Sequence, residues 1–178
     1  AGLPDCVTAQ TVNRYCSSGL QTIATAANAI RCGEEDVVIA GGVESMSLVP
    51  MLVGAEDADP WLAEHRPEVY TTMGITAENV ARQWGISRAD MDAMAVESHR
   101  RAAQAQAGGC FDGQIIPITV PGPDGGEVVV CRDEGIRPGT TAETLAGLKP
   151  CFLENGSVTA ATSSQMTDGA GFVVLMSR

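Results

Sequence analysis

Cys16 is the residue whose type and position most readily suggest covalent chemistry. It lies where an alternating segment gives way to a helical pattern, and Ser17, Ser18 and Gly19 follow it. At a helix start, the unpaired N–H groups and the positive end of the dipole favour the thiolate, which is the nucleophilic form of cysteine. From position alone, a buried structural cysteine is the stronger alternative, because free cysteines are among the most buried residues in proteins.

The other cysteines and the histidines do not suggest a second reactive centre. The six cysteines are far apart and include no Cys-x-x-Cys pair, so the pattern argues against zinc. His65 stands between charged residues in a proline-bounded segment, and His99 precedes two arginines, so we expect both to be exposed and without a chemical role. Cysteine is too sparse for a disulfide scaffold, which predicts reduced thiols in a cytosol-like compartment.

Composition excludes several functional classes. With 178 residues, 44% hydrophobic and 19% charged, the sequence is typical of a soluble globular protein with a sizeable core. Eleven Lys+Arg against 22 Asp+Glu give a net charge of −11, which repels nucleic acid. No apolar run approaches the roughly 18 residues that span a bilayer. An anionic ligand would therefore need a local site of backbone N–H groups and one or two arginines.

Strands and helices are expected to alternate around Cys16. Residues 6–12 alternate like a strand, and residues 17–32 repeat small and apolar side chains at helical spacing until Gly33. Residues 36–40 form the continuous apolar run that is typical of a strand covered on both faces. This order predicts α/β layering with a buried helix.

The remaining chain is expected to hold a long loop and further helices and strands. Residues 46–70 contain prolines and no periodicity, which predicts a functional loop. Thr76 can cap a helix to residue 84, and Ser87 with Asp90 forms a capping box before a helix through residue 107. The other predicted elements are strands 115–120 and 127–131, a short helix 141–148, a Gly/Ser/Thr-rich turn 156–169 and a buried strand 172–176.

Several segments resemble the thiolases in the same order as in that family. Residues 12–21, Val-Asn-Arg-Tyr-Cys-Ser-Ser-Gly-Leu-Gln, resemble the nucleophile segment, and residues 41–47, Gly-Gly-Val-Glu-Ser-Met-Ser, resemble the segment that follows it. Further matches are residues 73–78, 133–138, 148–152 and 158–170. The resemblance covers essentially the whole chain.

The resemblance implies an α/β fold with a thiolase-like layered N-terminal domain that is incomplete here. Residues 1–45 and 166–178 would belong to this five-stranded domain. A loop domain, residues 46–165, would interrupt it and carry most contacts with coenzyme A (CoA). The strand before Cys16 would pair across a dimer interface, so a homodimer or homotetramer is expected in the full-length parent. The expected compartment is the cytoplasm, with the peroxisome and mitochondrion as alternatives.

The implied chemistry is a two-step acyl transfer. Cys16 would attack the 3-keto carbonyl of a 3-ketoacyl-CoA, acetyl-CoA would leave, and the CoA thiol would collect the acyl group. CoA is then a substrate, and no metal or redox cofactor is required. Residues 133–138 and Thr72, where acetoacetyl-CoA thiolases usually carry histidine, favour the degradative 3-ketoacyl-CoA thiolases. A biosynthetic acetoacetyl-CoA thiolase and enzymes acting on ring-cleavage or steroid side-chain substrates are the alternatives.

Five further residues match positions that contact CoA or substrate in the family. Arg137 would stack on the adenine, Thr144 would place a small hydroxyl near it, and Met73 would line the acyl pocket. Ser164 would hydrogen-bond the pantetheine arm, and Ala160 is the small residue beside that arm. Without the resemblance, Arg137 would be interpreted as a solvated loop charge and Met73 as a packing residue of a loop. Ser164 would be interpreted as a turn or capping residue.

Glu44, Ala161 and Thr162 are three further positions within the matched segments. Glu44 is interpreted as a buried, hydrogen-bonded structural carboxylate rather than a base. Ala161 and Thr162 stand where many thiolases have Gly-Asn. Thr162 is a tolerated variation, whereas the extra Cβ of Ala161 narrows the approach to the CoA arm.

The family's other catalytic motifs, Asn-Glu-Ala-Phe, Gly-His-Pro and Cys-x-Gly, do not occur in this sequence. The histidine that activates the nucleophile and the second cysteine are therefore missing. The sequence resembles roughly the middle half of a thiolase, without the first strands and the C-terminal domain. We expect these 178 residues alone to be inactive or poorly folded. The alternative is a thiolase-like CoA- or lipid-binding module without turnover.

Overall fold

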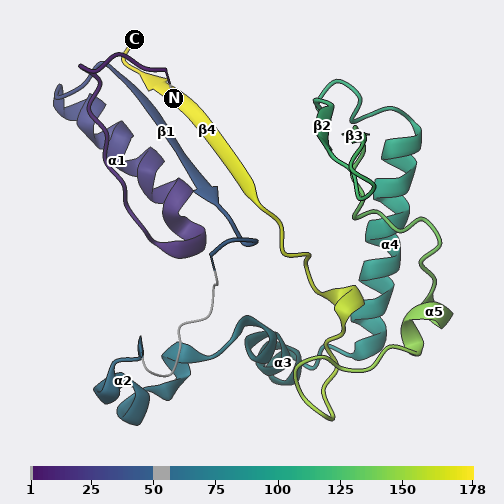
Figure 1. Ribbon diagram of the computed structural model, residues 1–178. Helices are drawn as coiled ribbons and strands as arrows, with labels where there is room; N and C mark the ends of the chain where they lie inside the picture. The colour runs from purple at the N-terminus through teal and green to yellow at the C-terminus, as the bar shows by residue number, and fades with distance from the viewer. Residues whose placement is uncertain (1, 50–56) are drawn as a thin grey trace. The chain divides into compact units, whose positions relative to one another are not determined.

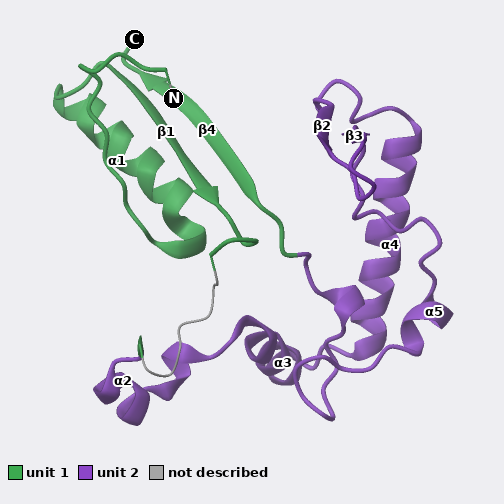
Figure 2. Cartoon of the chain, in the orientation of Figure 1, with its two compact units in different colours: residues 1–57, 166–178 green, residues 58–165 purple. Residues whose placement is uncertain are grey.

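The computed structural model describes residues 2–49 and 57–178. The chain divides into two compact units, residues 1–57 with 166–178 and residues 58–165 (Figure 2). The elements, in chain order, are α1 (Ser18–Cys32), β1 (Val37–Glu44), α2 (Pro60–His65), α3 (Met73–Trp84), α4 (Arg88–Ala107), β2 (Ile118–Pro121), β3 (Glu127–Val130), α5 (Ala142–Ala146) and β4 (Gly169–Met176) (Figure 1). Short 3-10 turns, η1 (Tyr15–Ser17), η3 (Pro67–Tyr70) and η4 (Ala160–Thr162), connect some of them.

The first unit is built on an antiparallel pair of long strands with α1 against one face. β1 and β4 pair from Val37 opposite Met176 to Glu44 opposite Gly169. The Thr22 hydroxyl on α1 donates a 2.9 Å hydrogen bond to the Gly41 carbonyl oxygen, which ties the helix to β1. Residues far apart in sequence thus meet in one small sheet.

Gly41 is required by the strand opposite it. Phe172 is its partner in the register, and a Cβ at position 41 would overlap the Phe172 ring and the Gly171 carbonyl oxygen. The ring therefore lies over the glycine, which marks a close cross-strand approach. At the next position, a Cβ on Gly42 would make only ordinary contact, 3.6 Å, with the Gly19 Cα of α1.

The helix expected before Gly33 is confirmed, but its burial was predicted wrongly. α1 ends at Cys32, and Gly33 caps it in the left-handed conformation with φ 74°. Ala26 is its buried residue, whereas Leu20 is 72% exposed. Only one face of α1 meets a sheet within the described chain, so its other apolar side chains are half-buried, as at Ile23 and Ile30, or exposed, as at Leu20.

The strands are also covered on one face only, contrary to the prediction for residues 36–40 and 172–176. Successive strand residues point to opposite faces, and Gly42 with Ala40 faces α1. The opposite face carries a set of exposed apolar side chains: Val37, Ile39, Val43, Phe172, Val174 and Met176. One helix can cover one face of a two-stranded sheet and no more.

Residues 6–12 do not form the expected strand. Residues 7–14 have no regular structure, because no strand in the described chain lies beside them to complete a ladder. Within the described residues, this unit contains one sheet of two paired strands, β1 and β4.

Helices are the main regular structure of the second unit. α3 begins at Met73 with Thr72 at its N-cap, earlier than expected from Thr76, whose hydroxyl instead donates to the Thr72 carbonyl oxygen at 3.0 Å. The capping box of Ser87 and Asp90 is confirmed, and α4 ends at Ala107 as predicted. No helix among residues 2–49 and 57–178 is long and apolar enough to cross a membrane.

Shorter elements complete the second unit. The hairpin of β2 and β3 is confirmed, although β2 starts three residues later than predicted, and α5 is shorter than the predicted helix 141–148. The expected long loop, residues 46–70, contains a helix, α2, that was not predicted. Asp59 caps α2 by accepting from the Leu62 N–H at 2.9 Å, and Pro60 occupies its first turn. Residues 50–56 of that expected loop lie outside the described residues.

Candidate functional site

Cys16 lies in a constrained turn immediately before α1. Its neighbour Tyr15 has φ 50°, the one positive φ among the described residues that are not glycine. A bulky residue in this conformation is strained and needs support from its surroundings. The Asn13 side chain supplies it by accepting from the Tyr15 N–H at 2.8 Å, and Ser18 donates to the Tyr15 carbonyl oxygen at 2.7 Å. The turn therefore holds Cys16 at the start of the helix.

The thiol of Cys16 is accessible. Cys16 is exposed and unpaired, which does not fit the alternative of a buried structural cysteine. The other five cysteines are exposed and unpaired as well, so exposure does not distinguish Cys16. What distinguishes it is the combination of a strained, hydrogen-bonded turn and a helix start, an arrangement that can present a nucleophile.

The five residues matched to substrate contacts all belong to the second unit, and all are exposed. Met73 opens α3 and is 69% exposed, Thr144 lies on α5, and Ala160 opens η4. Arg137 and Ser164 lie on loops between elements. No hydrogen bond joins any of the five to another within the described chain. Instead, side chains of α3 and α4 form hydrogen bonds with the segments on which Arg137, Thr144 and Ala160 lie.

Glu78 of α3 anchors the segment that leads to Ala160. Its side chain is buried, and its carboxylate accepts from the Ser157 N–H at 2.9 Å, the Ser157 hydroxyl at 2.9 Å and the Val158 N–H at 2.8 Å. Burial by itself raises the pKa of Glu78, but these donors and the charge of Arg82 outweigh it and lower the pKa below 4.5. A Cβ on Gly156 would overlap the carboxylate. The anionic side chain thus fixes this loop against α3.

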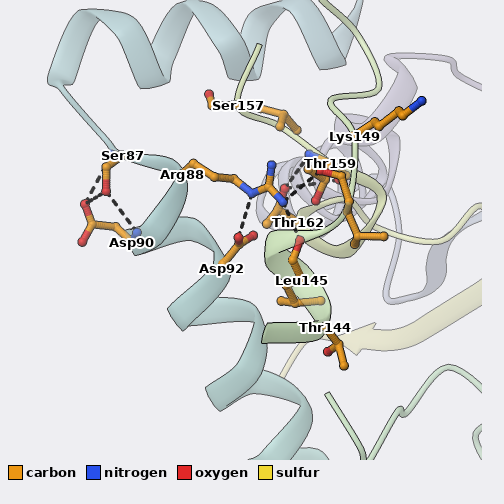
Figure 3. A network of polar contacts seen from close by, with 12 residues as sticks. Ser87, Arg88, Asp90, Asp92, Thr144, Leu145, Lys149, Ser157, Thr159 and Thr162 are labelled. Atoms are coloured by element: carbon orange, nitrogen blue, oxygen red, sulfur yellow. Dashed lines mark hydrogen bonds and ion pairs between the residues drawn. The ribbon is translucent and has the colours of Figure 1, made fainter. Parts of the chain in front are cut away.

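Arg88 of α4 anchors the segment that follows Thr144. Its Nε donates to an Asp92 carboxylate oxygen at 2.7 Å, and its Nη2 donates to the Leu145 carbonyl oxygen at 2.6 Å and to that of Leu148 at 3.2 Å (Figure 3). Leu145 is buried. One guanidinium therefore donates to one carbonyl in α5, to another just after it and to one oxygen of a buried carboxylate on α4. The other carboxylate oxygen, Asp92 Oδ1, is buried and has no hydrogen-bond partner among the described residues.

Thr144 and Thr162 both serve as capping residues. The Thr144 hydroxyl donates to the Thr141 carbonyl oxygen at 2.9 Å and accepts from the Thr141 N–H at 3.0 Å. Thr162 forms the same arrangement with Thr159, which is completely buried. These contacts shape α5 and η4, so both hydroxyls have structural roles that the resemblance did not indicate. Among the described residues, the Ser164 hydroxyl donates only to the adjacent Gln165 carbonyl oxygen, at 3.1 Å.

The two histidines differ from each other, which the sequence did not indicate. His65 is exposed, as expected, and its ring stacks on Trp61 with centroids 4.7 Å apart. His99 is half-buried rather than exposed, and its Nδ1 accepts a 3.2 Å hydrogen bond from the Arg137 N–H. The expectation that both are plain surface residues is therefore wrong for His99.

Two carboxylates of the first unit also depart from expectation. Glu44, expected to be buried and hydrogen-bonded, is exposed and makes no hydrogen bond through its side chain with the described residues. Asp168, to which no role was assigned, accepts from the Ser47 N–H at 2.9 Å. The hydrogen bonds from Ser47 lower the pKa of Asp168. Asp168 thus joins the segment after β1 to the segment before β4.

Comparison with known proteins identifies the family. A family model described as the thiolase N-terminal domain matches residues 1–178. The 3-ketoacyl-CoA thiolase of Bacillus subtilis is 52% identical over all of this chain, which spans 48% of that protein's length. The chain belongs to the thiolase family. This confirms the resemblance and the predicted α/β fold class.

Other thiolases agree with this assignment. The acetyl-CoA acetyltransferase of Cupriavidus necator is 43% identical over 99% of the chain, which again spans 48% of its length. The crystal structure of the dimeric peroxisomal thiolase of Saccharomyces cerevisiae has a TM-score of 0.79 and 39% identity, covering 93% of this chain and 42% of the yeast chain. The chain therefore spans about half the length of the thiolases it matches.

Sequence reasoning missed the residues that support the matched thiolase positions. Arg88 and Asp92 carry opposite charges four residues apart, a spacing that could have signalled an ion pair on one helix face. Glu78 is the last residue of a segment that resembles the thiolases, but no local feature of the sequence indicated that its side chain would be buried. For His99 no signal existed, because its partner lies 38 residues further along the chain.

Proposed function

We propose that this chain is the acyl-accepting and CoA-binding part of a 3-ketoacyl-CoA thiolase. In this reaction, the Cys16 sulfur bonds to carbon 3 of the substrate, and the bond between carbons 2 and 3 breaks. The electron pair stays on carbon 2, which takes a proton to give acetyl-CoA. The CoA sulfur then attacks the acyl–Cys16 thioester, giving a shortened acyl-CoA and the free cysteine.

The observation that carries this proposal is the setting of Cys16. The Cys16 thiol is exposed at a helix start, and it follows Tyr15, whose strained backbone is held by the Asn13 side chain. This setting suits covalent acyl transfer better than a structural role in a packed core. The match of the thiolase N-terminal domain to the whole chain supports the same role. The reacting groups are the 3-keto carbonyl with its adjoining carbon–carbon bond, thiols, thioesters and protons. Because no external electron donor or acceptor takes part, the proposed chemistry needs no redox cofactor, and it calls for no metal.

We assign CoA binding to the second unit. Arg137 would stack on the adenine, Thr144 would lie near it, and Ser164 and Ala160 would contact the pantetheine arm. Met73 would contact the acyl chain, where a pliable apolar side chain suits substrates of several lengths. The exposure of all five supports the assignment, since a residue must be accessible to meet a ligand. Ala161, beside Ala160 in η4, would narrow the approach to the arm.

We favour degradative thiolysis over biosynthetic condensation. The relative named 3-ketoacyl-CoA thiolase is 52% identical to this chain, whereas the relative named acetyl-CoA acetyltransferase is 43% identical. Thr72, at the N-cap of α3, replaces the histidine that acetoacetyl-CoA thiolases usually carry there. A role in fatty-acid β-oxidation would follow. Because the second relative also matches nearly the whole chain, a biosynthetic acetoacetyl-CoA thiolase is the second candidate.

A homo-oligomer belongs to the same proposal. The yeast structural neighbour is described as dimeric, which supports a dimer in the full-length protein. Light scattering coupled to size-exclusion chromatography would test it, and a monomeric mass at micromolar concentration would contradict it. A cytoplasmic location stays a prediction from the sequence.

The decisive experiment is mass spectrometry of the full-length protein that contains this chain, after incubation with acetoacetyl-CoA or 3-ketohexadecanoyl-CoA. We expect an acyl adduct on the peptide containing Cys16, removed by added CoA. The Cys16→Ala variant should carry none, and the control variant Cys32→Ala should carry as much as the parent. Preference for the longer substrate would support the degradative assignment, and preference for acetoacetyl-CoA would support the biosynthetic one.

A different result would favour the binding module. If the folded protein binds CoA with micromolar affinity but forms no adduct with either substrate, then the covalent role of Cys16 is wrong. An adduct that persists in Cys16→Ala would place the nucleophile elsewhere.

A further inference from the structure

His99 and Gln106 hold the loop that carries Arg137 from the same face of α4. They lie seven residues apart, which is close to two helical turns, so their side chains lie one above the other. Gln106 Nε2 donates to the Asp133 carbonyl oxygen at 3.2 Å, and His99 Nδ1 accepts from the Arg137 N–H at 3.2 Å. Residues 133–137 are thus attached to α4 at both ends.

Contacts within the loop fix the backbone further. The Asp133 carboxylate accepts from the Gly135 N–H at 2.8 Å. The Arg137 carbonyl oxygen accepts from the Thr140 hydroxyl at 2.8 Å and from the Thr140 N–H at 3.2 Å. Both backbone polar groups of Arg137 are therefore bonded. Its guanidinium, in contrast, is exposed and makes no hydrogen bond or ion pair with any part of the chain that the structure describes.

We propose that His99 is a positioning residue for the CoA site, acting through the backbone of Arg137; this role rests on the proposed function. The backbone of Arg137 is fixed, while its guanidinium has no partner among the described residues. Such a site is pre-organised for a ligand, because the loop is already ordered before the ligand binds. The hydrogen bond needs a neutral imidazole with its proton on Nε2, since only an unprotonated Nδ1 accepts. His99 does not touch the substrate itself.

The test compares two substitutions of His99 in the full-length enzyme. His99→Leu removes the acceptor, whereas His99→Asn keeps an acceptor, Oδ1, close to the position of Nδ1. We expect His99→Leu to raise the KM for CoA in thiolysis by roughly threefold to tenfold, the effect of one hydrogen bond, with little change in kcat. His99→Asn should restore the parental KM. The control His65→Leu, which alters an exposed histidine, should change neither constant.

A double-mutant cycle tests whether the effect passes through Arg137. In an Arg137→Ala background, His99→Leu should raise the KM for CoA no further. An equal rise in that background, an unchanged KM in His99→Leu, or failure of His99→Asn to restore the KM would each overturn the proposal. If His99→Leu does not fold, Gln106→Ala gives the same comparison, because it removes the other attachment of the loop.

Hydrogen exchange separates this proposal from the proposed function. We expect the Arg137 amide to exchange faster in His99→Leu and at the parental rate in His99→Asn, whether or not the protein is an active thiolase. An unaltered Arg137 amide in His99→Leu would overturn the positioning role. Absence of an acyl adduct on Cys16, or an Arg137→Ala variant with unchanged affinity for CoA, would instead count against the proposed function.

Discussion

The carboxylate of Glu78 accepts a 2.8 Å hydrogen bond from the N–H of Val158, a residue 80 positions further along the chain. Both oxygens of this carboxylate also accept from Ser157. An α-helix and a distant loop are thereby joined through one buried anion. Because that loop continues into η4 and Ser164, its fixation bears directly on the proposed CoA site.

Replacement of Glu78 by glutamine should loosen this loop. The amide keeps one acceptor oxygen but places an NH2 group against backbone donors, so at least one buried N–H loses its partner. We expect the Glu78→Gln variant to be destabilised by about 1–3 kcal/mol, with faster exchange of the Ser157 and Val158 amides. Glu154→Gln, which changes an exposed carboxylate in the same loop, is the matched control. Equal exchange in the two variants would contradict the anchoring role.

The lowered pKa of Glu78 predicts a stability that depends on pH. Its folded-state pKa lies below the ordinary value of 4.5, so in mild acid the unfolded chain takes up the proton first. The stabilisation is therefore complete above the ordinary value and is lost as the pH falls through the folded pKa, from about pH 5 downward. Thermal melts should show the parent losing more stability than Glu78→Gln over that range. Parallel losses would show that Glu78 does not contribute.

Arg88 should matter more for stability than the other arginines of α4. Arg88→Met leaves the Asp92 carboxylate, whose side chain is 10% exposed, without its cation, and leaves two carbonyls of residues 145–148 without a donor. Allowing for partial exposure of Arg88, we expect a loss of about 2–4 kcal/mol in urea unfolding. Arg101→Met, which breaks the exposed pair with Glu97, should have little effect. Similar losses in both variants would contradict the special role of Arg88.

Two adjacent glycines of β1 should respond differently to alanine. Gly41→Ala would drive a Cβ into Phe172 across the sheet, whereas Gly42→Ala would make only a 3.6 Å contact with Gly19. We therefore expect Gly41→Ala to destabilise the protein by about 1–3 kcal/mol, as overpacking does, and Gly42→Ala to cost less. Chemical denaturation of both variants makes the comparison. The reverse order would contradict the register of β1 and β4.

The elements read correctly from sequence are those with local signals. Ser87 and Asp90 define the start of α4 through hydrogen bonds that span three residues, and Gly33 ends α1 because it adopts a positive φ that other residues avoid. Residues 6–12 show the limit of such reading. Their alternation satisfies the pattern of a strand, but a strand exists only beside a partner, and none lies beside them in the described chain.

By itself, the sequence determined the α/β fold class, the thiolase family and the position of Cys16 before a helix. These conclusions depend on short segments, whose residue types and order are visible in the chain. Only the tertiary structure decided the pairing of β1 with β4, the burial of Glu78 and the contact of His99 with Arg137. Each joins residues 38 or more positions apart. Such contacts depend on the path of the chain in space, which no local pattern of residues encodes.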